Sequence, residues 1–372
     1  MSSCIGCNAQ GSLISDTLGL CRDCIESDFE THHAHLESVH RRVRADFGMP
    51  LMSPREPDGL ACDVCARSCS MLPGQKGYCS VRGNADGDIV VPSETPGAAF
   101  VEVRLEPLPN SCAAAFACPG CSAAGYPKYS RSRGAESGFN CLAVSYNSCN
   151  FNCLFCEHWE FREKAAPEYL MTPEQVVQQI DDSVTCLRFT GGDSIPQIEH
   201  ALQVAELAAR ETRGRILRLC WETNGSLRHS YIQRIARLAF ESGGLIKIEL
   251  KAFSPKIHYA LCGISNRQVL NNFRALQKVA AQRPEAPLLA ASTVLVPGYV
   301  TPTEVWRISQ FMASRGPATP YALLAFFPHF HLNDLPCTSR EHAASALDSA
   351  RDAGLKRLRL GNTFYIEEQA YL

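Results

Sequence analysis

The chain has 372 residues, of which 45 % are hydrophobic, and its formal net charge is −2. This length suits one large domain with one or two small ones, and the near-neutral charge gives no clear signal for nucleic-acid binding. The sequence has no run of 18 apolar residues, and its first residues lack a basic start followed by an apolar stretch. We therefore expect no membrane span, no secretory signal and a cytoplasmic location.

The 19 cysteines are the dominant compositional feature, and outside the secretory pathway clustered cysteines indicate metal ligands before disulfides. The first group pairs Cys4 and Cys7 with Cys21 and Cys24. Two CxxC knuckles of this form are typical of a zinc ribbon, and iron in a rubredoxin-like site is the alternative. A helix is predicted to follow over 26–46, with its four histidines in solvent.

Two further cysteine groups precede residue 141. Cys62, Cys65, Cys69 and Cys79 could hold zinc or a second iron–sulfur cluster, as a structural site or an electron relay. The next group is Cys112, Cys118 and Cys121, with Cys141 beyond a polar loop. It could form another metal site, a redox pair or a contact to substrate.

From Leu142 onward, short apolar runs alternate with helical stretches. Seven buried strands are predicted, over 142–146, 186–189, 216–221, 245–250, 288–295, 322–327 and 356–360. Capping signals at Thr172 and Thr338 predict two helix starts. This alternation predicts an α/β fold, either an open doubly wound sheet or a partial (β/α)6-type TIM barrel, preceded by the cysteine-rich metal-binding segments. We expect three parts, over 1–50, 51–140 and 141–372.

Ligands of such folds lie at the carboxyl ends of the strands, and the first predicted strand ends in a loop containing Cys149, Cys153 and Cys156. Three thiolates can hold three corners of a [4Fe–4S] cluster and leave one iron open. The other six strands also end in polar or glycine-containing loops, so we expect one active-site mouth.

Several of these strand ends suit a charged ligand. Gly191 and Gly192 would leave backbone groups open to it. The opposite charges of Glu222, Glu249 and Lys251 could clamp a zwitterion such as an amino-acid moiety. Strand alternation places Glu249 and Lys251 on one face, which we expect to be the barrel interior.

The CxxxCxxC motif, the following Gly-Gly-Asp and the predicted barrel resemble the radical S-adenosylmethionine (SAM) superfamily. Residues 249–266 are similar to a segment of the pyruvate formate-lyase activating enzyme branch, and residues 62–84 resemble the amino-terminal segment of its AmmeMemoRadiSam relatives. The aspartate of that branch is Glu249 here, and the insert over 112–121 has no counterpart.

The resemblance implies specific roles. Cys149, Cys153 and Cys156 would bind a [4Fe–4S] cluster whose open iron takes SAM. The other residues expected around SAM come from five strand ends: Phe155, Gly191, Gly192, Asp193, Glu222, Glu249, Lys251 and His329, with His331 competing for the last place.

The expected activity is that of a radical SAM oxidoreductase. Reductive cleavage of SAM would yield a 5′-deoxyadenosyl radical that abstracts hydrogen from a protein or peptide substrate, with a low-potential electron donor as partner. One alternative is a small-molecule substrate with auxiliary iron–sulfur clusters. The other is a non-catalytic, zinc-rich interaction protein.

Overall fold

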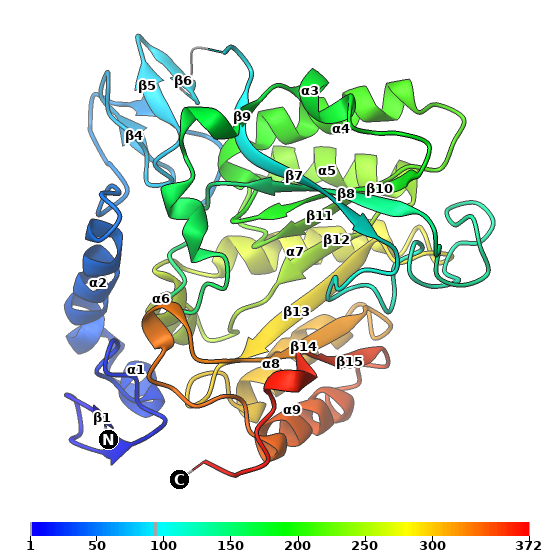
Figure 1. Cartoon of the computed structure of the whole chain (residues 1–372). Coiled ribbons are helices and arrows are strands. Elements are labelled where there is room, and N and C mark those ends of the chain that lie inside the picture. Colours follow the sequence, from blue (N-terminus) through cyan, green and yellow to red (C-terminus); the bar gives the residue numbers. More distant parts are fainter. Residues whose placement is uncertain (1, 92–94, 372) are drawn as a thin grey trace.

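The computed structural model describes residues 2–91 and 95–371, and one nine-stranded sheet organises most of it (Figure 1). The strand order is β15-β14-β13-β12-β11-β10-β8-β7-β9. Seven parallel strands confirm the seven predicted ones: β8 (Asn140–Tyr146), β10 (Val184–Gly191), β11 (Arg218–Thr223), β12 (Ile246–Glu249), β13 (Leu289–Leu295), β14 (Tyr321–Ala325) and β15 (Leu358–Gly361).

Two antiparallel strands, β7 (Ala99–Pro107) and β9 (Leu170–Met171), extend this sheet at the β8 side. The sequence analysis did not predict them. The alternation of β7 is weak, because its second half is largely exposed. The predicted α/β class is confirmed, and the paired strands of the described chain leave β9 and β15 as two open edges, as in a partial barrel.

Helices alternate with the parallel strands and pack along the sheet (Figure 1). They are α3 (Pro173–Val177), α4 (Ile198–Glu211), α5 (His229–Ser242), α6 (Pro255–Cys262), α7 (Arg267–Ala280), α8 (Pro302–Ala313) and α9 (Arg340–Asp352). Short 3-10 turns lie at Trp159–Glu163, Pro167–Tyr169, Ile195–Gln197, Phe330–Leu332 and Thr363–Tyr365. Within the described ranges, no helix has both the length and the apolar character needed to cross a bilayer.

One of the two predicted helix starts is confirmed. Thr172 caps α3, and its side chain and that of Gln175 form a reciprocal capping box. The cap assigned to Thr338 is wrong, because Ser339 accepts the hydrogen bond from the backbone of His342. The hydroxyl of Thr338 is instead bonded to Phe326 and Leu295 in the sheet.

The amino-terminal segments lie at the carboxyl ends of the parallel strands (Figure 1). They contain β1 (Ser2–Ser3), β2 (Gln10–Gly11), α1 (Arg22–Ser27), α2 (Phe29–Ala45), β3 (Leu60–Ala61), β4 (Ser70–Met71), β5 (Gly83–Ala85) and β6 (Asp88–Val90). The single helix predicted over 26–46 is interrupted at Asp28. The expectation of solvated histidines fails at His40, which is buried and contacts the carbonyls of Tyr259 and Ala260.

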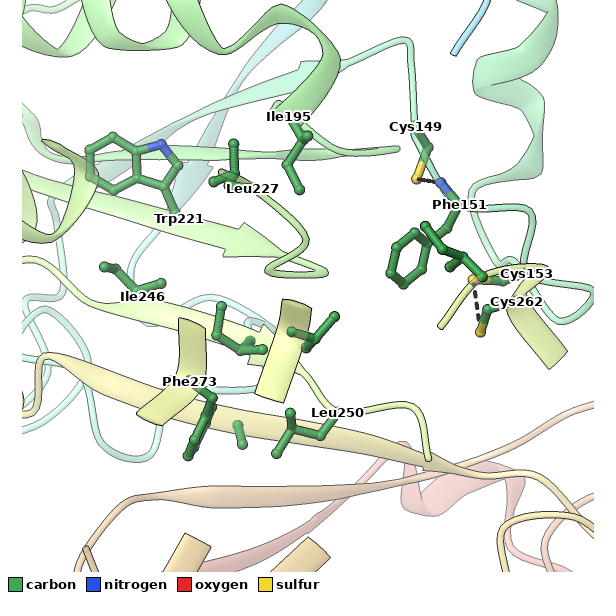
Figure 2. Packing of buried hydrophobic residues seen from close by; sticks show 14 of the residues in the cluster. Cys149, Phe151, Cys153, Ile195, Trp221, Leu227, Ile246, Leu250, Cys262 and Phe273 are labelled. Atoms are coloured by element: carbon green, nitrogen blue, oxygen red, sulfur yellow. Dashed lines mark hydrogen bonds between the residues drawn. The ribbon is translucent and has the colours of Figure 1, made fainter. Parts of the chain in front are cut away.

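Apolar side chains fill the space between the sheet and its helices. Phe189 and Trp221, from neighbouring strands, stack with ring centroids 4.8 Å apart. Figure 2 shows that this packing continues from Trp221 and Ile246 to the loop of Cys149 and Cys153. The core therefore supports the carboxyl ends of the strands, where the predicted site lies.

Candidate active site and metal centres

The loop after β8 brings Cys149, Cys153 and Cys156 together. Cys149 and Cys153 are buried, and Cys156 is partly exposed. Two backbone hydrogen bonds fix the loop to the end of α6, from Asn152 to the Cys262 carbonyl at 3.1 Å and from Leu154 to the Leu261 carbonyl at 3.0 Å. The loop is therefore held by tertiary contacts on its inner side.

A fourth thiol, Cys262, lies against this loop. Its Sγ is 3.5 Å from that of Cys153 (Figure 2). The hydrogen bond from Cys262 lowers the pKa of Cys153 to about 7, against the opposing effect of burial. On the other side, the amide Nδ2 of Asn224 lies 3.8 Å from the Cys149 Sγ. The sequence analysis missed Cys262, because an isolated cysteine in a helix gives no spacing signal.

The sulfur spacing separates the loop from a single-ion site. In a tetrahedral zinc site with Zn–S bonds of about 2.3 Å, neighbouring sulfurs lie about 3.8 Å apart. Among the described residues, only Cys4, Cys7, Cys21 and Cys24 bring three or more potential ligand atoms within 4.8 Å of one another. The three loop sulfurs therefore do not all lie within 4.8 Å of one another, which fits a multi-iron cluster better than one tetrahedral ion.

Lys251 and Glu249 lie beside the cysteine loop, on the shared face that strand alternation predicts. The Lys251 Nζ is 2.6 Å from a Glu249 carboxylate oxygen and 5.2 Å from the ring centroid of Phe155. Burial alone would lower the pKa of Lys251, but the charges of Cys153 and Glu249 raise it well above its usual value. Phe155, Glu249 and Lys251 therefore form one group at the loop.

A row of alternating charges extends from this group across the sheet. Lys247 Nζ lies 3.3 Å from Glu249 and 3.1 Å from Glu222, and Arg188 lies 3.2 Å from Glu222 and 2.7 Å from Glu106. Burial raises the pKa of the Glu222 carboxyl, but Lys247 and Arg188 outweigh it and lower the pKa to about 2. Glu222 thus stays ionised within this row, and it lies farther from the cysteine loop than Glu249.

The Gly191-Gly192 turn is shaped by close backbone packing. A Cβ on Gly191 would lie 2.5 Å from the Tyr146 nitrogen, and one on Gly192 would lie 2.4 Å from the Ser148 oxygen. Gly191 also has a φ of +95°, which favours glycine. These glycines let the end of β10 approach the start of the cysteine loop.

Asp193 is buried and fully engaged within the protein. Its carboxylate accepts hydrogen bonds from the backbone of Ile195 at 3.0 Å, from the backbone of Asn224 at 2.7 Å and from the Thr223 hydroxyl at 3.0 Å. Burial raises its pKa to about 7 in spite of these bonds. Asp193 therefore joins the ends of β10 and β11, beside the Asn224 that approaches Cys149.

The His329 ring contacts the cysteine loop, whereas His331 reaches the loop through its backbone, whose nitrogen donates to the Leu154 carbonyl at 3.1 Å. The His329 Nε2 is 3.0 Å from the Phe155 carbonyl, and its Nδ1 is 2.5 Å from the Phe327 carbonyl. The His331 ring faces Asp46, 3.9 Å away. This placement favours His329 over His331 as the histidine of the site.

A second group of thiols surrounds a cavity of about 30 Å³ near the amino ends of the strands. Six cysteines line it: Cys112, Cys118, Cys121, Cys141, Cys186 and Cys220. The Cys112 thiol donates to a Glu222 oxygen at 2.9 Å, and the sulfurs of Cys186 and Cys220 are 3.8 Å apart. This thiol chamber thus adds two strand cysteines to the group that spacing suggested.

The amino-terminal cysteines form two separate groups. Cys4, Cys7, Cys21 and Cys24 form the compact group described above, which fits the spacing of one tetrahedral ion. The other set, Cys62, Cys65, Cys69 and Cys79, lines a cavity of about 20 Å³ that Asn150 of the cysteine loop also borders. The second site therefore adjoins the candidate active site.

Comparison with known proteins gives a family for the central part of the chain. Residues 144–307 match the family model of the radical SAM superfamily. A protein of Methanocaldococcus jannaschii, named only as uncharacterised, is 22 % identical over 309 residues, which cover 82 % of this chain and 81 % of that protein.

Three solved structures illustrate the range of similar folds. A domain of the Bacteroides vulgatus pyruvate-formate lyase-activating enzyme is 19 % identical, with a TM-score of 0.38, and the match covers 47 % of this chain and 98 % of that one. SuiB of Streptococcus suis bound to SAM is 12 % identical (TM-score 0.42; 59 % and 48 % covered). A radical SAM methyltransferase of Sphaerobacter thermophilus is 14 % identical (TM-score 0.45; 60 % and 67 % covered).

Proposed function

We propose that this chain, which the domain over residues 144–307 identifies as a radical SAM enzyme, binds a [4Fe–4S] cluster through Cys149, Cys153 and Cys156. The observation that carries the proposal is the convergence of these thiols with Lys251 and Glu249 on one side of a buried loop. Once bound, the cluster supplies the electron for reductive cleavage of SAM to a 5′-deoxyadenosyl radical.

The charged pair beside the loop suits the methionine part of SAM. Lys251 would bind its carboxylate, and Glu249, whose side chain remains 36 % exposed, would be open to its ribose or ammonium group. Phe155, 5.2 Å from the Lys251 nitrogen, offers a flat apolar surface for adenine. The Lys251 side chain is only 11 % exposed, which strengthens its charge interactions.

The remaining predicted residues would stabilise the positions of the cysteine loop, Lys251 and Glu249 without contacting SAM. Gly191 and Gly192 allow the close approach of β10 to the loop. The Asp193 carboxylate accepts hydrogen bonds from Ile195, Thr223 and Asn224 and so joins the strand ends. His329 would fix the Phe155 carbonyl, and Glu222 would stabilise the charge row. We therefore assign these five residues to positioning.

We propose a protein or peptide as the substrate, with hydrogen abstraction as the reaction. This proposal is supported by the similarity of residues 249–266 to the activating-enzyme branch. A small-molecule substrate is the second candidate, because the charge row leads from the cysteine loop to the enclosed thiol chamber. The radical SAM domain leaves the non-catalytic alternative without support.

Deuterium transfer tests the substrate class. Extracts of cells grown in heavy water are divided into macromolecular and small-molecule fractions. Each fraction is then incubated anaerobically with reconstituted enzyme, SAM and dithionite. We expect deuterated 5′-deoxyadenosine with the macromolecular fraction, and its loss after protease treatment. Deuterium from the small-molecule fraction alone would favour the second candidate. Cys153→Ala should abolish transfer, whereas Cys337→Ala, at a cysteine outside these sites, should retain it.

A further inference from the structure

Cys62, Cys65, Cys69 and Cys79 surround an enclosed space between the amino-terminal hairpins and the sheet. The β3–β4 hairpin closes it, with the Cys62 backbone donating to the Cys69 carbonyl at 2.7 Å. Cys62 and Cys69 are buried, and the cavity between the four thiols measures about 20 Å³. Four thiolates brought together in this way need positive charge among them.

Three polar side chains at this cavity have buried donors that make no hydrogen bond of normal geometry to the described residues. These donors are Nη2 of Arg67, Nε of Arg82 and Nδ2 of Asn150, of which the Asn150 side chain already interacts with the Cys65 thiol. Asn150 is 1 % exposed and Arg82 is 7 % exposed, so water does not compensate freely. An unsatisfied buried donor costs about 1–3 kcal/mol, which indicates that an acceptor belongs in the cavity.

An anionic iron–sulfur cluster would provide such acceptors, because its sulfurs accept hydrogen bonds from nearby donors. In a zinc site the four thiolate sulfurs would be the only acceptors, whereas a cluster adds its bridging sulfides. The sulfur spacing agrees. Among the described residues, only Cys4, Cys7, Cys21 and Cys24 form a set whose sulfurs all lie within 4.8 Å of one another. The Cys62–Cys79 sulfurs are more widely spaced, like those of the Cys149–Cys156 loop.

This cavity is joined to the cysteine loop through Asn150. The Arg67 Nε donates to the Asn150 carbonyl at 2.8 Å, and the Asn224 amide donates to the Asn150 side chain at 2.8 Å. The same Asn224 nitrogen lies 3.8 Å from the Cys149 sulfur. One asparagine, next to Cys149 in the chain, thus borders both sites.

Backbone contacts hold the two sites in register. The Ala66 nitrogen donates to the Ser226 carbonyl at 3.1 Å, and the Arg228 nitrogen donates to the Val64 carbonyl at 2.9 Å. Residues 64–66 therefore run alongside 226–228, directly after β11 and Asn224. The four-thiol cavity is thereby fixed to the end of the sheet that holds the cysteine loop.

We propose that Cys62, Cys65, Cys69 and Cys79 bind an iron–sulfur cluster that passes electrons to the cluster on the Cys149–Cys156 loop. One electron enters from a low-potential external donor, which is oxidised, and reduces the four-thiol cluster. That cluster is reoxidised when the same electron moves past Asn150 to the loop cluster. The acceptor end of this relay rests on the proposed function, whereas the metal identity does not.

Metal analysis of a loop-deficient protein tests the cluster alone. The triple variant Cys149→Ala/Cys153→Ala/Cys156→Ala is reconstituted anaerobically, and its iron, acid-labile sulfide and zinc are measured. We expect iron and sulfide in equal amounts, about four of each per chain for a cubane cluster. Adding Cys62→Ala and Cys65→Ala should remove them, whereas adding Cys337→Ala should not. More than one zinc per chain with no acid-labile sulfide, or sulfide that survives the five-fold variant, would overturn the assignment.

Electron delivery tests the relay. With reduced flavodoxin as donor, Cys65→Ser should form 5′-deoxyadenosine at least tenfold more slowly than the parent, with unchanged SAM binding. Cys337→Ala should match the parent. An equal rate in Cys65→Ser would refute the relay. If the parent forms no 5′-deoxyadenosine while the triple variant still holds iron and sulfide, the proposed function fails and the four-thiol cluster stands.

Discussion

The ion pair between Arg218 and Glu136 makes the most demanding prediction about the architecture. Arg218 lies on β11, and Glu136 lies in the connection between β7 and β8 that also contains Cys112, Cys118 and Cys121. Their side chains are 1 % and 0 % exposed, and two hydrogen bonds of 2.9 and 2.7 Å join them. This pair therefore anchors the wall of the thiol chamber to the sheet.

Glu136→Gln should destabilise the protein by about 3–5 kcal/mol, because it leaves the buried Arg218 charge without a counter-ion. Replacing both residues, as in Arg218→Met/Glu136→Leu, should cost less than either single change, since the desolvation of both charges is then relieved. Urea unfolding followed by tryptophan fluorescence measures these differences. A cost below 1 kcal/mol for Glu136→Gln would refute the reasoning.

The pH dependence of this pair has a definite sign. Burial raises the pKa of Glu136, but its bonds with Arg218 outweigh burial and lower the pKa overall. A depressed carboxyl pKa contributes stability above the unfolded-state value, and this stability is lost as the pH falls through the folded-state value. Glu136→Gln should therefore show a smaller loss of stability on acidification than the parent.

Four more predictions concern single side chains. Cys262→Ala should lower the loop-cluster potential by about 40 mV, the equivalent of one hydrogen bond of about 1 kcal/mol, in an EPR redox titration; an unchanged potential contradicts this. Lys251→Met should weaken SAM binding at least tenfold by calorimetry, whereas the exposed Lys278→Met should not. Cys7→Ala should lose one zinc per chain by metal analysis, and undiminished zinc would oppose the ribbon assignment. Burial lowers the pKa of His200 to about 4. Acidification from pH 6.5 to 4 should therefore reduce the free energy of unfolding by about 3 kcal/mol, because the unfolded state takes up a proton before the folded state does. In urea titrations, His200→Gln should not show this loss.

The parallel strands were predictable because each one is a short, nearly continuous apolar run between helical stretches. The loop of Cys149, Cys153 and Cys156 was equally visible, since its spacing is local. In contrast, β7 lies in a segment where cysteine groups dominate the pattern, and its exposed second half obscures the strand signal. Its place depends on pairing with β8, which only the three-dimensional structure shows.

The charge row and the thiol chamber were not readable from the sequence. Arg188 and Lys247 each sit inside an apolar strand, and they meet Glu222 only because β10, β11 and β12 are neighbours. Cys186 and Cys220 lie 34 residues apart, yet their sulfurs are in contact. Such sites depend on strand order, which residue spacing along the chain does not encode.

The formation of 5′-deoxyadenosine tests the central claim most directly. The anaerobically reconstituted parent and Cys153→Ala are each mixed with SAM and dithionite, and the product is quantified by mass spectrometry. The account predicts that the parent accumulates 5′-deoxyadenosine with an equal amount of methionine, and that Cys153→Ala forms none. Equal yields from the two proteins, or no product from a parent that holds its full iron content, would contradict it.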